Sequence, residues 1–453
     1  MAGYYNKDKD YSKELMRTDL SASERAQLTQ ERQNKIDAVY GGKEPTLADG
    51  SGKTYNQKYG GSSVANAERV MNVANRIAET YKEGNSVVVA VSAQGDTTDE
   101  LIEKAREINP KPSKREMDML LATGEQISIA LLAMALEKLS VPVVSMTGWQ
   151  AGIYTDSKYG GAKIKRINSE RILSELDSNK VVIVAGFQGI NKYDDITTLG
   201  RGGSDTSAVA LAAALKADLC QIYTDVDGVY TTDPRICPDA KKLSEITYDE
   251  MLELASLGAN VLMNRSVELA KKYNVNLEVL SSLHKAPGTI VKEVTKVEKS
   301  NVRGIARDND VAMISVLDVP DEPGIAFKVF SMLAKHNINV DMILQSIGRE
   351  DKKDISFSVK QDECEEAVKL LSDNNIINAR KIIYKENVSK VSIVGAGMVS
   401  NPGVASMMFE AMYDAHINIH MICTSEIKVS ILIDREYADK AVRALHDKYN
   451  LAK

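Results

Sequence analysis

The sequence predicts an α/β protein with a three-layer αβα domain around a mostly parallel central sheet, followed by two smaller βαββαβ modules of the ferredoxin-like type. Short β-branched runs, such as residues 87–91 and 180–186, alternate with helical patterns as far as about residue 290. This alternation favours a parallel sheet with helices on both faces, and runs without polar alternation are typical of fully buried strands. From about residue 299 the pattern changes, and a unit of about 80 residues occurs twice.

The composition is that of an ordinary globular protein. The 453 residues are 43% hydrophobic and 26% charged, with a net charge of −6, so we expect about three domains and no nucleic-acid partner. We expect no membrane partner and a cytoplasmic location, because no apolar run spans a bilayer and the N-terminus lacks a signal-peptide core. The cysteines are too scattered for a metal or redox motif and are expected to be free thiols: Cys220, Cys237, Cys364 and Cys423.

Residues 1–52 are predicted to form a polar N-terminal extension with no chemistry of its own. Ser21 and Glu24 match a capping box, and a helical pattern continues to Tyr40. Residues 47–52 then resemble a linker.

The most informative stretch is the glycine-rich sequence TLGRGGSDTS at residues 198–207. Glycine permits positive φ and close approach to a ligand, and the helix-forming run 208–216 predicts that a helix follows directly. Three residue types that favour the N-cap position lie between them: Ser204, Asp205 and Thr206. The start of such a helix binds anions, and Arg201 would add a bidentate partner for a carboxylate or phosphate. A plain structural turn is the alternative interpretation.

Two further loops follow predicted strands. The sequence KYGGSS at residues 58–63 precedes a helical pattern over 64–81, and SAQGDTT at 92–98 follows the strand predicted at 87–91. Open α/β sheets bind ligands at the carboxyl ends of their strands. We therefore expect both loops to contribute to a binding site.

Glu125 lies in a long apolar helical region, residues 117–139. A carboxylate in such surroundings is costly unless it meets a cation. That cation is either the ammonium group of a ligand or the partner in an internal salt bridge, and the sequence leaves both alternatives open.

A third loop, YTDVDGVYTTDPR at residues 223–235, follows the strand predicted at 219–223. Its three carboxylates resemble a calcium loop only superficially, because the later ligand positions and the terminal glutamate are missing. A nucleotide pocket is the better interpretation.

The C-terminal repeat has the predicted order β-α-β-β-α-β in each copy. The turn PGIA at 323–326 matches PGVA at 402–405, and INV at 338–340 matches INI at 417–419. The repeat predicts two split βαβ modules. We assign 53–298 to the large domain, 299–384 to the first module and 385–453 to the second.

Six motifs in the same order resemble those of the aspartate kinases, members of the amino-acid kinase superfamily that carry paired ACT domains. The resemblance runs from about residue 57 to the C-terminus. The motifs are KYGGSS at 58–63, SAQGDTT at 92–98, GE at 124–125, GFQG at 186–189, TTLGRGGSD at 197–205, and residues 223–235.

The resemblance implies a role for each candidate residue. Lys58 and Asp205 would be catalytic. The substrate would be bound by Ser92, Thr98, Glu125, Arg201 and Ser204. ATP would be bound by Lys58, Tyr59, Gly60, Gly61, Thr224, Asp225, Tyr230, Asp233, Pro234 and Arg235.

The implied reaction transfers the γ-phosphate of ATP to the β-carboxylate of L-aspartate, with Mg²⁺ held through the ATP phosphates rather than by a protein metal site. The ACT pair implies feedback by lysine, threonine or both, and a homodimer or higher homo-oligomer formed through these modules. The effector would be bound by Asp321, Asn339, Asp341, Gln345, Asn418, Ile419, Ser425 and Glu426.

Three departures from the family pattern leave other functions open. The first strand is polar at residues 53–57, Asn260 replaces a lysine that reaches ATP in the family, and Met263 and Asn264 replace a more usual His-Pro pair. The first strand is therefore expected to be weak or supplied differently. A different amino-acid kinase, or a catalytically impaired amino-acid sensor, are the alternative functions.

Overall fold

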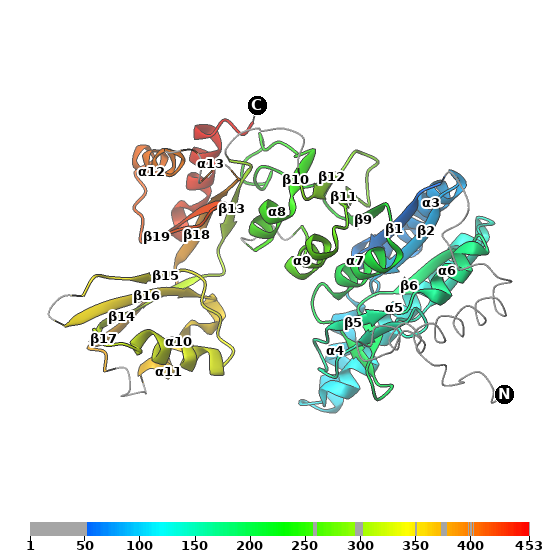
Figure 1. The fold of residues 1–453 in the computed structure, drawn as a ribbon, viewed down its shortest axis with the longest axis horizontal. Coiled ribbons are helices and arrows are strands. Elements are labelled where there is room, and N and C mark those ends of the chain that lie inside the picture. The colour runs from blue at the N-terminus through cyan, green and yellow to red at the C-terminus, as the bar shows by residue number, and fades with distance from the viewer. Residues whose placement is uncertain are drawn as a thin grey trace, which may run out of the picture.

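The computed structural model describes residues 52–452, apart from 257–260, 295–301, 349–350, 373–377, 397, 399–400 and 402. The predicted capping box at Ser21 and Glu24, the helix that reaches Tyr40 and the substituted Asn260 lie outside the described residues. Figure 1 shows an α/β unit, drawn blue to green, at one end of the molecule and two smaller modules, drawn yellow to red, at the other.

An eight-stranded sheet forms the centre of the large unit, in the order β10-β12-β11-β9-β1-β2-β6-β3. All neighbouring strands are parallel except β11 and β12. The strands are β1 (Thr54–Tyr59), β2 (Ser86–Val91), β3 (Val143–Met146), β6 (Val181–Ala185), β9 (Leu219–Thr224), β10 (Glu245–Thr247), β11 (Leu277–Ser281) and β12 (Thr289–Lys292). The predicted mostly parallel sheet is confirmed.

Helices cover both faces of this sheet, as its apolar strands require. The helical elements are η1 (Gly61–Val64), α3 (Ala67–Lys82), α4 (Thr97–Ile108), α5 (Lys114–Lys138), α6 (Glu170–Asp177), α7 (Gly203–Leu215), α8 (Tyr248–Leu254) and α9 (Asn264–Tyr273). α3 and α5 pack on one face, and α6 to α9 pack on the other. α5 is long and apolar enough to cross a membrane by composition, but it contributes to the core against α3 and the sheet.

β1 is a central strand despite its polar sequence, so the expectation of a weak or replaced first strand is wrong. It pairs with β2 on one side and β9 on the other. Gln57 is fully buried, and its amide donates to Gln221 Oε1 at 3.0 Å. Gln221 in turn donates to Glu278 at 2.9 Å. A buried polar strand is tolerated because these hydrogen bonds continue across three neighbouring strands.

A small sheet that the sequence analysis missed lies beside α5. Its order is β5-β4-β7-β8, and its strands are β4 (Ile153–Thr155), β5 (Ile164–Ile167), β7 (Gln188–Ile190) and β8 (Ile196–Thr198). These strands are three or four residues long, too short to show alternation in the sequence. β8 leads directly into the glycine-rich turn.

The first C-terminal module has the predicted βαββαβ order and a purely antiparallel sheet, β15-β16-β14-β17. It consists of β14 (Ala312–Pro320), α10 (Ile325–Lys335), β15 (Ile343–Gln345), β16 (Lys352–Val359), η3 (Gln361–Glu363), α11 (Cys364–Ser372) and β17 (Lys381–Lys385).

The second module obtains one strand from outside its own repeat. It consists of β18 (Val388–Val394), α12 (Val404–Asp414), β19 (Met421–Thr424), β20 (Lys428–Asp434), η4 (Arg435–Tyr437) and α13 (Ala438–Lys448). Its fourth strand is β13 (Gly304–Asp308), which precedes the first module and pairs antiparallel with β18. The first module is therefore inserted between two parts of the second, whereas the sequence repeat placed them one after the other.

All four cysteines are free thiols, as expected.

Candidate functional site

The glycine-rich turn enters α7 with two left-handed residues, Gly200 at φ 78° and Gly202 at φ 67°. Gly202 is the N-cap residue, so α7 begins at Gly203. A Cβ atom on Gly202 would lie 2.1 Å from the Met263 side chain, which leaves room for glycine alone. The prediction that Ser204 and its neighbours cap a helix starting at 208 is wrong, because α7 is buried nearly all round and extends back to the glycines.

Lys58 and Asp205, the two residues predicted to be catalytic, form an ion pair. Lys58 Nζ is 2.7 Å from Asp205 Oδ1, and both side chains are nearly buried. Lys58 lies near the carboxyl end of β1, where alternation points its side chain toward α7. The first turn of α7 supplies Asp205. The pair thus joins β1 to α7 through two residues that are 147 positions apart in the sequence (205 − 58).

Glu125 has no charged partner among the described residues, so the structure contains no internal salt bridge of the kind the sequence left open. Its Oε1 accepts a hydrogen bond from the Ala93 backbone N–H at 3.1 Å, while Oε2 is buried without a partner. Burial raises the pKa of the Glu125 carboxyl to about 7. A buried carboxylate with one unused oxygen is suited to an incoming ammonium group.

The other proposed substrate-binding residues lie in the loop after β2, at the start of α4, in the glycine-rich turn and in the first turn of α7. Ser92 and Thr98 are half-buried in the loop after β2 and at the start of α4. Ser204 packs so tightly against Gly186 that a Cβ atom there would lie 2.8 Å from Ser204 Oγ. Arg201 is exposed at the tip of the turn. No carboxylate of the described chain pairs with its guanidinium.

Asp118 and Arg265 hold the glycine-rich turn in place, and the sequence analysis missed both. Asp118 is 1% exposed and accepts hydrogen bonds from Thr198 Oγ1 at 2.7 Å, from Thr198 N at 3.0 Å and from Gly160 N at 2.9 Å. Arg265 donates to the carbonyl oxygens of Leu199 and Ala162, both at 2.7 Å. The sequence feature that could have identified Asp118 is its position as a carboxylate within the apolar helical region 117–139.

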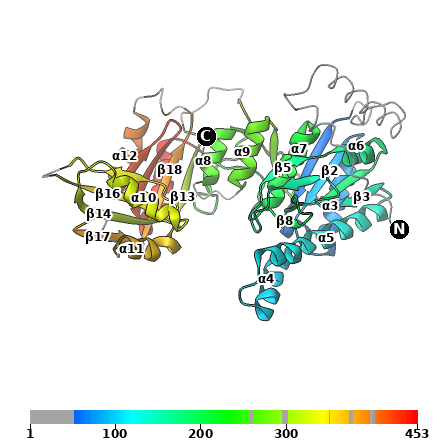
Figure 2. The ribbon, with the colours of Figure 1, turned by 60° about the horizontal axis from the view of Figure 1, so that its bottom comes forward.

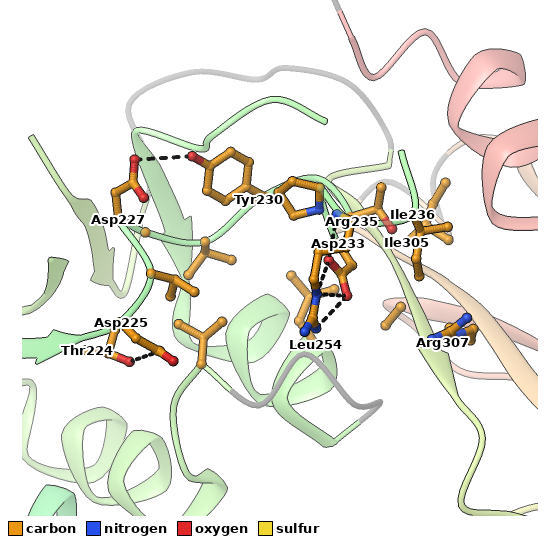
Figure 3. A pocket seen from close by; sticks show the side chains of 17 residues that line it. Thr224, Asp225, Asp227, Tyr230, Asp233, Arg235, Ile236, Leu254, Ile305 and Arg307 are labelled. Carbon is orange, nitrogen blue, oxygen red and sulfur yellow. Dashed lines mark hydrogen bonds and ion pairs between the residues drawn. The ribbon is translucent and has the colours of Figure 1, made fainter. Parts of the chain in front are cut away.

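A cavity of about 620 Å³ lies at the loop after β9. All six expected ATP-binding residues of this loop line it: Thr224, Asp225, Tyr230, Asp233, Pro234 and Arg235 (Figure 3). The Arg235 guanidinium binds Asp233 at 2.8 Å and holds the pKa of that carboxyl below its usual range. The opposite wall includes Ile305 and Arg307 of β13. A strand of the second module thus borders the cavity, which the sequence could not reveal.

The Tyr59 side chain does not lie where a nucleotide-binding residue was expected. Its side chain is fully buried on the α3 face of the sheet and stacks on Tyr223 with ring centroids 4.5 Å apart. Only its backbone faces the loop that contains Gly60. Gly61 lies against the loop after β2, because a Cβ atom on it would be 2.5 Å from the Ala93 carbonyl oxygen.

The expected effector residues lie on loops and edge strands of the two modules. Asp341 of the first module binds Lys390 on β18 of the second, and Asp321 binds Lys353 at 2.9 Å. Gln345 is exposed on β15, an edge strand. The four predicted residues of the second module flank β19, the edge strand of its sheet: Asn418, Ile419, Ser425 and Glu426. Asn339 is exposed after α10.

The fold and the site define an amino-acid kinase domain joined to a pair of ACT modules. The model of the amino acid kinase family matches residues 57–281, and the ACT domain model matches residues 314–374 and 391–449.

The relatives narrow this class to one family. The chain is 52% identical to the aspartokinase of Bacillus sp. strain MGA3 over 87% of this chain and 97% of the relative, and 50% identical to that of Corynebacterium glutamicum over 87% and 96%. A crystal structure of E. coli aspartokinase III in complex with aspartate and ADP is 25% identical, with a TM-score of 0.72 over 87% of this chain and 99% of that one. The chain belongs to the aspartokinase family.

Proposed function

We propose that the chain transfers the γ-phosphate of ATP to the β-carboxylate of L-aspartate and forms 4-phospho-L-aspartate and ADP. The observation that carries this proposal is the Lys58–Asp205 pair at 2.7 Å, placed near the carboxyl edge of the sheet. The carboxylate nucleophile is already ionised at pH 7, so no general base is needed. Catalysis then consists of positioning and stabilisation of charge.

Lys58 would stabilise the negative charge of the transferring phosphoryl group, since its compact ammonium group can approach the phosphate oxygens. Asp205 fixes the position of that ammonium group through their ion pair. The near-complete burial of both side chains strengthens this interaction relative to water.

The two ends of aspartate would be recognised by opposite charges. Glu125 offers a buried oxygen without a partner to the α-ammonium group. Arg201 offers an exposed fork of donors to the α-carboxylate. Ser92, Thr98 and Ser204 would complete the pocket with hydroxyl groups.

ATP would occupy the cavity after β9, with its phosphates extending toward Lys58. The described residues contain no cluster of three potential metal ligands. We expect Mg²⁺ to be held chiefly by the phosphates of ATP, as is usual for this ion. The ion would neutralise phosphate charge during transfer.

Feedback by lysine, threonine or both would act through the two modules, in a homo-oligomer located in the cytoplasm. A crystal structure of E. coli aspartokinase III in complex with lysine and aspartate, 25% identical to this chain, supports lysine as the first effector to test. β13 offers a physical connection, because it belongs to the second sheet and also borders the nucleotide cavity.

One experiment separates this function from its alternatives. ATP-dependent phosphorylation is measured with aspartate, glutamate and homoserine, each with and without lysine and threonine. We expect turnover with aspartate alone and inhibition by at least one effector. Turnover with another acceptor would instead identify a different amino-acid kinase, and effector binding without turnover would identify a sensor.

A further inference from the structure

A second cavity, of about 280 Å³, lies on the opposite face of the central sheet from Lys58. It is formed by the loop after β1, one face of α3 and the segment that follows β11. Its lining residues are Ser63, Arg69, Asn72, Asn75, Arg76, Glu79, Ser282, Leu283 and Lys285. None of these residues lines the nucleotide cavity. The two cavities are therefore separate sites at the same edge of the sheet.

The lining of this cavity is positively charged. Three cations, Arg69, Arg76 and Lys285, face a single carboxylate, Glu79. Lys285 Nζ binds Glu79 at 2.7 Å, so the positive charge of the two arginines remains unbalanced. Such a concentration of positive charge attracts an anion.

The two arginines are held in place by neighbouring groups. Arg76 lies over the Tyr223 ring, 5.6 Å from its centroid, and Arg69 donates to the carbonyl oxygen of Ser62. They are seven residues apart on α3 and therefore share one face of the helix. They line the cavity from positions two helical turns apart.

Ser63 gives independent support for a ligand. It is 3% exposed and lines the cavity, yet its hydroxyl group has no hydrogen-bond partner. Its backbone N–H is already used, since it donates to the Gly60 carbonyl oxygen at 2.9 Å. A buried hydroxyl without a partner is unfavourable, and an anion beside it would accept its hydrogen.

We propose that this cavity binds a phosphate group, either as inorganic phosphate or as the phosphate of a small metabolite. A tetrahedral phosphate presents acceptor oxygens in several directions and so can accept from the arginines and Ser63 at once. A planar carboxylate has fewer directions to offer. The site lies beside the loop that contains Gly60 and Gly61, but it does not depend on the proposed kinase reaction.

The test is a calorimetric titration of the full-length protein with inorganic phosphate at constant ionic strength, in the presence of saturating ADP and aspartate. We expect one phosphate per chain, with at least tenfold weaker binding in Arg76→Gln and in Ser63→Ala. The control variant is Arg171→Gln. Arg171 is an exposed residue of α6 that lines neither cavity, so this variant should bind phosphate as tightly as the unsubstituted protein. Phosphoserine, titrated in the same way, distinguishes a phosphate ester from the free ion as the preferred ligand.

Three results would overturn the proposal: no measurable phosphate binding, binding that disappears when ADP is present, or binding that neither variant weakens. Disappearance with ADP would place phosphate in the nucleotide cavity instead. If Arg76→Gln loses thermal stability, Lys285→Gln replaces it, because Lys285 is mostly exposed and its removal disturbs less of the fold.

Discussion

Glu125→Gln should abolish the fall in kcat/KM for aspartate that we expect as the pH is lowered. Burial raises the pKa of Glu125 to about 7 in the ligand-free protein. Only the ionised form attracts the ammonium group of aspartate, so the proton must leave before the substrate binds. At pH 6 about one molecule in eleven is ionised, which predicts a roughly tenfold lower kcat/KM than at pH 8, or about 1.4 kcal/mol.

The assay measures initial rates between pH 5.5 and 9 with saturating ATP and aspartate below its KM. The parent should show an acid limb with a pKa of about 7, whereas kcat at saturating aspartate should depend less on pH, because the bound ammonium group lowers the pKa of Glu125. Glu125→Gln should lose the limb and reduce kcat/KM at least a hundredfold, since a buried ammonium group would lack its counter-charge.

Glu137→Gln is the matched control, because Glu137 is an exposed carboxylate on the same helix. It should retain both the rate and the limb. The role of Glu125 as the partner of the substrate ammonium group would be refuted by either of two results. One is an acid limb that persists unchanged in Glu125→Gln, and the other is an acid limb near pH 4.5 in the unsubstituted enzyme.

Four further predictions test the other parts of the site. Lys58→Ala or Asp205→Ala should abolish turnover in a hydroxamate assay while the circular dichroism spectrum stays unchanged; near-normal rates in either would contradict the catalytic assignment. Asp118→Asn should raise KM for aspartate about tenfold and leave KM for ATP unchanged, because an amide cannot accept from every donor that now surrounds the carboxylate; equal changes in both constants would argue for a general loss of folding. Arg307→Ala should weaken ATP binding several-fold in a direct binding measurement without changing KM for aspartate, since Arg307 lines the cavity after β9. Asp341→Asn should shift the concentration of lysine or threonine that gives half-maximal inhibition, because it removes the ion pair to β18; an unchanged inhibition curve would exclude Asp341 from effector control.

The sequence alone determined the class of fold and most of the candidate site. Hydrophobic periodicity reports which faces of an element are buried, so most strands and helices of the large unit and the two modules could be predicted, but not the short strands β4, β5, β7 and β8. The loops after β1, β2 and β9 were predictable because ligands of a parallel sheet bind at the carboxyl ends of its strands. Lys58 and Asp205 could be paired only through the family resemblance.

The tertiary structure decided which distant residues share an environment. No strand was predicted at residues 304–308, yet β13 forms there by pairing with β18 and brings Arg307 to the nucleotide cavity. The polar β1 was misjudged because its hydrogen bonds are made with a strand about 160 residues away. The raised pKa of Glu125 likewise arises from burial among elements brought together by folding. Such long-range contacts create the electrostatic environment of the site, and no local stretch of sequence contains them.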